Sequence, residues 1–228
     1  MNRQNDGGSG WRRDLVWLVA GFGLLVGWDM AGADLAVARW FGSATGFALR
    51  EAWWTSGLLH EGGRRLAWAV LLVLVVGIWR PLPAFAGLSK RERVGWVLVT
   101  LAAVLLVPSI KRVSLTSCPW DLAEFGGMAQ YVSHWRWGVG DDGPGHCFPS
   151  GHAAGAFAFL SGFFVLRPHR PGLARGWLVG VLVLGALFGG AQLARGAHYP
   201  SHTLWTAWFC WAVCLAGQRV MEITDTAR

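Results

Sequence analysis

The chain has 228 residues, of which 54% are hydrophobic and 16 are tryptophans, and its formal net charge is +7. This composition excludes an ordinary soluble domain and predicts an integral membrane protein. The positive charge does not predict a nucleic-acid partner, because Lys and Arg occur in short clusters between apolar runs rather than along one polar face.

Six apolar runs predict six transmembrane helices, so the expected fold is an all-α polytopic membrane bundle. A helix needs about 20 predominantly apolar residues to cross a hydrocarbon core of about 30 Å. The first and last runs are short, and we expect tryptophans at their ends to anchor them in the membrane interface. The runs are Leu15–Trp28, Leu66–Trp79, Val94–Ile110, Ser150–Leu166, Trp177–Leu193 and His202–Ala216.

One membrane domain is expected over residues 11–218, because no internal repeat or soluble domain is visible. Residues 1–10 are polar and rich in Gly, which predicts a disordered N-terminus. Residues 219–228 are expected to form a cytoplasmic tail. Between the first two runs, Leu35–Phe41 predicts either a short helix lying in the outer interface or an ordinary connecting loop.

The distribution of Lys and Arg predicts that both termini are cytoplasmic. With the N-terminus inside, the inner segments carry 12 of these residues, and the outer segments carry 8 over nearly twice the length. The expected location is therefore a bacterial inner (cell) membrane. An alternative is that the first run is a cleaved signal peptide, because Arg12 and Arg13 precede it and Ala31–Ala33 resembles a cleavage site.

Three segments rich in ionisable residues lie at the ends of apolar runs, and all three fall on the predicted outer face. They are Lys111–Asp121, Cys147–His152 and Arg195–His202. Ionisable groups at membrane depth are costly and usually functional. Their position on one side of the membrane therefore predicts a single site.

The residues of these segments are suited to binding phosphate. Pro149 predicts the first turn of a helix, where free backbone N–H groups and the positive end of the helix dipole can hold an anion. Basic side chains from the other two segments would add fixed positive charge. The predicted phosphate-binding residues are Lys111, Arg112, Ser150, Gly151 and Arg195.

The three segments resemble the motifs of the type 2 phosphatidic acid phosphatase superfamily, which also includes vanadate haloperoxidases. The family pattern has a Lys followed after six residues by Arg-Pro, then Pro-Ser-Gly-His, then an Arg six residues before a His that is followed four later by Asp. The second motif is intact at Pro149–His152. In the first motif, Lys111 and Pro119 fit, whereas Cys118 occupies the Arg position.

The third motif departs further from the family pattern. His198 stands at the expected position, but His202 replaces the Asp and Gln192 occupies the usual Arg position. Arg195 lies one helical turn nearer His198, where it could take over the role of that Arg. The resemblance covers the six-span layout and the spacing of the motifs.

The resemblance implies a membrane lipid phosphatase in which His198 attacks phosphorus and His152 protonates the departing lipid oxygen. It also implies a lipid phosphate substrate and no metal or other cofactor. The chemistry of imidazole agrees, since a neutral ring is nucleophilic near neutral pH and a protonated ring can act as a general acid. The oligomeric state and the particular lipid are not predicted.

The group that orients His198 is left open by the sequence. In the family, an acid four residues after the nucleophile holds the other ring nitrogen, as the carboxylate does in a catalytic triad. His202 is one turn from His198 and is predicted to join the catalytic residues in this role. The preferred orienting acid is Asp121, with Glu124, Asp141 and Asp142 as the alternatives.

Other functions must be weighed against hydrolysis. A phosphotransferase could use the same phosphohistidine, and a non-catalytic lipid-binding protein could retain the same scaffold. A metal site is a further alternative, because His198 and His202 could present two ligands on one helix face and Cys118, Cys147 or His152 could complete the site.

The four cysteines predict one disulfide. Cys118 and Cys147 both lie in the outer loop, where an oxidising compartment permits a bond between them. Cys210 and Cys214 lie one turn apart in the last run and are expected to be free thiols packed between helices.

Overall fold

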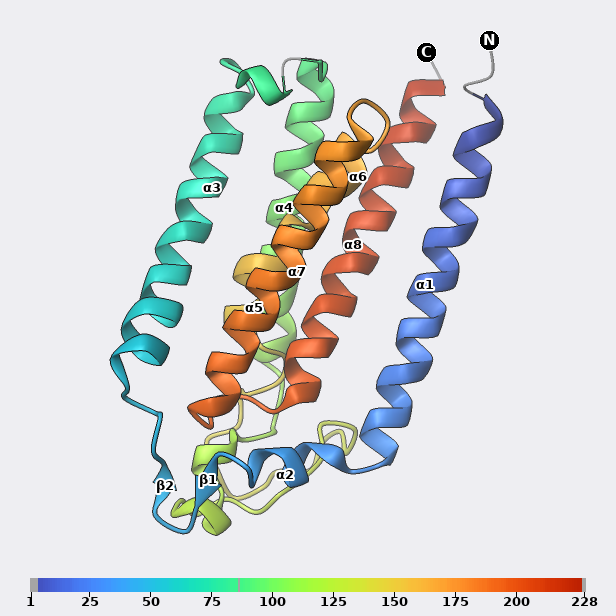
Figure 1. Ribbon diagram of the computed structural model, residues 1–228. Coiled ribbons are helices and arrows are strands. Elements are labelled where there is room, and N and C mark those ends of the chain that lie inside the picture. The colour runs from blue at the N-terminus through green and yellow to red at the C-terminus, as the bar shows by residue number, and fades with distance from the viewer. Residues whose placement is uncertain (1–3, 86, 227–228) are drawn as a thin grey trace.

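The computed structural model describes residues 4–85 and 87–226, and most of this chain is helical (Figure 1). Six long helical rods run side by side within these residues, and each overlaps one predicted apolar run. The rods are α1 (Gln4–Met30), η1 (Trp53–Gly62) continued by α3 (Gly63–Gly77), α4 (Lys90–Lys111), α5 (Gly151–Phe157) continued by η5 (Ala158–Leu160) and α6 (Ser161–Leu166), α7 (Pro171–Ala194), and α8 (Pro200–Thr226).

Short elements connect the rods. The segment between α1 and α3 contains the helix α2 (Ala33–Ala38), so of the two alternatives for Leu35–Phe41 the structure has the short helix, which ends before Trp40 and Phe41. It is followed by a hairpin of two short antiparallel strands, which the sequence analysis did not predict. The remaining elements are β1 (Gly42–Ser43), β2 (Gly46–Phe47), and the single helical turns η2 (Pro83–Phe85), η3 (Pro119–Asp121) and η4 (Ala123–Phe125).

The prediction of an all-α fold is therefore confirmed. Within the described residues, α4 and α7 are the two helices long and apolar enough to cross a membrane by length and composition. The helix α3 and the rod from Gly151 to Leu166 are shorter. Six membrane crossings remain a prediction.

Two predicted boundaries differ from the structure. The helix α1 begins at Gln4, so most of the N-terminal segment predicted to be disordered is helical, and residues 1–3 lie outside the described chain. Adding residues to a helix that already exists costs much less than starting one, which explains the extension. Likewise, α8 continues to Thr226, so no separate tail begins at residue 219.

The polar connections gather at one end of the bundle. Figure 1 shows that the start of α1 and the end of α8 lie together at the opposite end from α2, the β-hairpin and the loops after α4. The site motifs at the end of α4, the start of α5 and the α7–α8 turn all lie at that polar end. We call it the site end below.

Close helix packing fixes the rods that carry the motifs. A Cβ atom added to Gly185 would lie 2.2 Å from the ring of Phe157, and one added to Gly189 would lie 2.3 Å from Thr203. Only glycine therefore lets α7 approach α5 and α8 this closely. The start of α8 is held by Asp34 of α2, whose carboxylate accepts hydrogen bonds from the backbone N–H and the hydroxyl group of Ser201.

Candidate active site

His198 lies at the centre of the site end, in the turn between α7 and α8. Its side chain is buried, and its Nδ1 atom lies 3.4 Å from Nδ1 of His202 and 3.5 Å from Sγ of Cys147. Burial, followed by the positive charge of Lys111, lowers the pKa of His198 well below its usual range. The ring is therefore neutral near neutral pH, which is the state that a nucleophilic imidazole needs.

The second and third motifs are directly hydrogen-bonded to each other. The backbone N–H of Ser150 donates to the carbonyl oxygen of His202 over 3.2 Å. The hydroxyl of Thr206 lies within hydrogen-bond distance of the carbonyl oxygens of both Ser150 and His202, at 3.1 and 2.7 Å. These contacts fix the start of α5 against the first turn of α8.

A disulfide joins the first and second motifs. Cys118 and Cys147 are bonded in the structure, whereas Cys210 and Cys214 are free and buried in α8, as the sequence led us to expect. Position 118, where the family pattern has an Arg, is therefore occupied by a cysteine that is covalently bonded to Cys147, close to Pro149. It thereby attaches the loop after α4 to the segment that begins α5.

Of the residues predicted to bind phosphate, Lys111, Ser150 and Gly151 form one group near His198. Ser150 is fully buried, and its hydroxyl has no hydrogen-bond partner among the residues that the structure describes. At Gly151 an added Cβ would meet no atom within 4 Å, so open space adjoins that backbone. Lys111 lies close enough to His198 for its charge to act on the ring. Arg112, by contrast, is exposed and is not brought to this group.

Arg195 supplies the second positive charge of the site end. It is mostly buried, and its Nε donates to the carbonyl oxygen of Arg50 over 2.8 Å. Burial, followed by the charge of Arg195, lowers the pKa of His60. Arg195 therefore belongs to the side of the site that carries His60 and His152.

His152 occupies a more open position than His198. Its ring stacks on that of His60 of η1, with centroids 4.5 Å apart, and contacts Phe188 of α7 at 5.0 Å. Its Nε2 lies 3.0 Å from the carbonyl oxygen of Leu59 and donates to it when that nitrogen carries the proton. Nδ1 is then the nitrogen available to exchange a proton with a substrate.

The prediction that Asp121 orients His198 is wrong in this structure. The Asp121 carboxylate accepts a hydrogen bond from the backbone N–H of Cys118 over 3.2 Å and so closes its own turn, η3. Asp141 likewise accepts from the N–H and hydroxyl of Ser117. The side chain beside Nδ1 of His198 is that of His202, as the four-residue spacing predicted.

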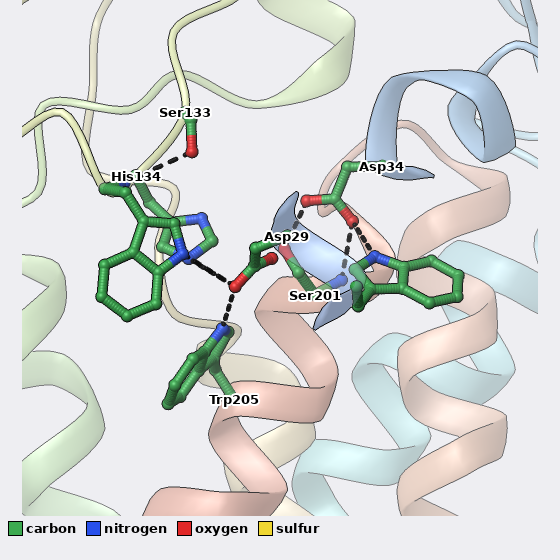
Figure 2. A network of polar contacts seen from close by, with 8 residues as sticks. Asp29, Asp34, Ser133, His134, Ser201 and Trp205 are labelled. Carbon is green, nitrogen blue, oxygen red and sulfur yellow. Dashed lines mark hydrogen bonds and ion pairs between the residues drawn. The ribbon is translucent and has the colours of Figure 1, made fainter. Parts of the chain in front are cut away.

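Two carboxylates that the sequence analysis did not single out, Asp29 and Asp34, contact the first turns of α8 (Figure 2). Asp29 accepts hydrogen bonds from the indole N–H groups of Trp135 and Trp205, both at 2.8 Å, and lies 3.4 Å from Nε2 of His134. Asp34 accepts hydrogen bonds from the indole N–H of Trp28 and from the backbone N–H of Ser201, both at 2.9 Å. Asp29 belongs to α1 and Asp34 to α2. Both precede the three family motifs in the sequence, so the motif spacing does not predict them.

The metal-binding alternative loses two of its candidate ligands in this arrangement. Cys118 and Cys147 share a disulfide and cannot offer thiolates. Asp29, Asp34 and His134 also place ligand atoms within 4.8 Å of one another. Their carboxylate oxygens, however, are held by N–H and O–H donors, which compete with a cation for the same lone pairs.

Comparison with known proteins finds a similar fold among solved structures. A crystal structure titled as the first transmembrane PAP2 type phosphatidylglycerolphosphate phosphatase, from Bacillus subtilis, shares the fold with a TM-score of 0.58 and 16% sequence identity. The alignment covers 92% of this chain and 96% of that one. No curated protein matches in sequence.

A family model matches the part of the chain that carries all three motifs. Residues 93–223 match the model of the PAP2 superfamily, a range that includes the end of α4, the start of α5 and the α7–α8 turn. The match covers more than half of the sequence and agrees with the intact Pro149–His152 motif. This chain belongs to the PAP2 superfamily.

Proposed function

We propose that this protein is a membrane lipid phosphatase that hydrolyses a phosphomonoester or diphosphate of a lipid through a phosphohistidine on His198. The observation that carries the proposal is the buried ring of His198, which its burial and the charge of Lys111 keep neutral. The intact Pro149–His152 motif supports it, because the buried hydroxyl of Ser150 has no hydrogen-bond partner among the described residues. Nδ1–H of His198 donates to Nδ1 of His202, which leaves Nε2 with a free lone pair.

In the first step, Nε2 of His198 attacks phosphorus and the bond between phosphorus and the lipid oxygen breaks. His152 gives its Nδ1 proton to that oxygen, while Nε2–H stays on the carbonyl group of Leu59. Lys111, Arg195 and the hydroxyl of Ser150 stabilise the negative charge on the equatorial oxygens, which is the main requirement of phosphoryl transfer. The products are the dephosphorylated lipid and a phosphohistidine.

In the second step, water attacks the phosphohistidine. His152, now neutral, accepts a proton from that water, and the bond between Nε2 of His198 and phosphorus breaks to release phosphate. No metal takes part in this scheme.

The proposed location is a bacterial inner membrane with the site at the outer, periplasmic face and both termini in the cytoplasm. The disulfide supports this placement, because such bonds persist in oxidising compartments. The start of α1 and the end of α8 lie together at the end of the bundle opposite the site end, which also supports this placement (Figure 1). A reporter fused after Arg228 should be active only in the cytoplasm, and the opposite result would contradict the proposed face.

The central experiment looks for the covalent intermediate. Purified protein incubated with a lipid labelled in its phosphate should acquire an acid-labile, base-stable label, and His198→Ala should abolish both the label and turnover. Vanadate should inhibit, since it adopts the geometry of pentacoordinate phosphorus, and chelators should have no effect. Full turnover by His198→Ala, or loss of turnover with chelators, would contradict the proposal.

A further inference from the structure

An apolar groove runs along the bundle from the neighbourhood of His152. It lies between α3, the α5–η5 segment and α7 and has a volume of about 380 Å³. Its wall on α7 extends from Gly176 to Phe188, which corresponds to about 18 Å along the helix axis. This length is close to one leaflet of a hydrocarbon core of about 30 Å.

Glycine residues, which have no side chain, leave the space that forms the groove. Gly176 and Gly180 face it from α7, and an added Cβ at either position would meet no atom within 4 Å. Gly155 faces it from α5, where an added Cβ would lie in ordinary contact with Ala67, 3.6 Å away. The one polar side-chain atom of its lining, Nε1 of Trp177, is occupied by a hydrogen bond to the carbonyl oxygen of Phe159. The groove therefore offers only apolar contact.

Phe188 connects the groove with the site. Its ring lines the groove and contacts the ring of His152. His152 is the residue that gives a proton to the departing lipid oxygen in the proposed reaction. The hydrocarbon part of the substrate is attached to that oxygen, so it must leave the site from this side.

We propose that this groove holds a hydrocarbon chain of the lipid substrate while its phosphate lies at His198. The proposal rests on the proposed function and extends it, because it predicts selection for long-chain lipid phosphates. Continuity with His152, the apolar lining and the length of about one leaflet all favour a substrate chain as the occupant.

A second hollow near the site does not fit this role. It has a volume of about 290 Å³ and lies between the loop after α4 and α8, beside Phe148 and His134. Its lining includes Ser114, Thr116 and Arg136, and it adjoins the nucleophile side rather than the leaving-group side. It serves below as the alternative location for the chain.

The first test narrows the groove by one substitution in the full-length protein. Gly180→Leu should raise KM about tenfold for dioleoyl phosphatidate in mixed micelles and leave KM for dihexanoyl phosphatidate unchanged, with kcat retained for both. The control is Gly190→Leu, a matched change on the same helix at an exposed position outside the groove, also with no atom within 4 Å of an added Cβ. Equal effects on both substrates, or none, would overturn the proposal.

A second test needs no turnover, so it separates this proposal from the proposed function. Vesicles would contain a phosphatidate with a diazirine at the end of one chain, or a phosphatidylcholine that carries the same chain. We expect the phosphatidate to label the groove walls of α3, α5 and α7, and Gly180→Leu to reduce that labelling. Equal labelling by the phosphatidylcholine would mean that bulk lipid fills the groove, and labelling confined to residues 113–139 would place the chain in the second hollow. Either result would overturn the proposal.

Discussion

The two imidazoles of the proposed reaction, those of His198 and His152, lie in different surroundings at the same end of the bundle. His198 is buried, contacts His202 and Cys147, and stands beside a turn that Asp34 anchors through Ser201. His152 is half-buried and is held by one ring stack and one carbonyl group. The surroundings of His198 are buried, whereas His152 contacts Phe188, which lines an apolar groove. We call the surroundings of His198 the closed side of the site and those of His152 the open side.

This difference matches what each residue must do in the proposed reaction. The nucleophile meets the same phosphoryl group in every substrate, and a fixed ring in a dry environment brings its nitrogen into line with phosphorus at little entropic cost. The acid meets the variable part of the substrate, which must pass between the site and the membrane. Different lipids can therefore share one phosphate site.

The largest expected effect comes from the open side. His152→Ala should lower kcat by about 10²–10⁴-fold for an alkyl phosphate, because removal of a general acid has this effect when the leaving oxygen is basic. For an aryl phosphate with a good leaving group the loss should be much smaller, and phosphohistidine should still form. Steady-state kinetics with the two substrates would measure this, and equal losses would contradict a role in protonation.

The sequence singled out His152 and His198 because their signals are local. Pro149–His152 is a contiguous motif, and His198 and His202 are separated by one helical turn. Their roles as acid and nucleophile come from the resemblance to the family motifs and stay proposals. The six rods followed from apolar runs long enough to cross a membrane. Cys118 and Cys147 were paired because both lie in the same outer loop.

The missed residues have no local signal. Asp34 reaches Ser201 across 167 positions, and His60 stacks on His152 from a different rod. Asp121 was chosen by its nearness to the first motif in sequence, but it closes its own turn instead. Which acid faces which imidazole depends on how the rods pack, and one sequence does not contain that information.

The next effect concerns the stability of the closed side. The disulfide closes a loop across 29 positions, so its loss should lower the free energy of unfolding by about 3–4 kcal/mol. Thermal unfolding of Cys118→Ser/Cys147→Ser in detergent would measure this, with Cys214→Ala as a control that removes a free buried thiol. Turnover of the variant should fall in proportion to its folded fraction. An unchanged midpoint of thermal unfolding would show that the disulfide does not stabilise the closed side.

The smallest expected effect comes from restoring the family residue beside the nucleophile. In this chain, burial and the charge of Lys111 keep the pKa of His198 low, and His202 offers no negative charge to oppose them. The carboxylate introduced by His202→Asp would stabilise the protonated ring and raise that pKa. The free enzyme needs a neutral His198 ring. As the pH is lowered, activity would therefore begin to fall at a higher pH in this variant than in the unchanged protein.

We therefore expect the acidic limb of the kcat/KM profile to move to higher pH in His202→Asp, with a change of less than about tenfold at the optimum. His202→Asn provides the control, because it keeps a hydrogen-bonding side chain without the charge and should leave the limb unmoved. A shift of equal size in both variants would mean that repacking, not charge, caused it. A shift to lower pH in the Asp variant would show that the side chain at position 202 does not act on His198 electrostatically.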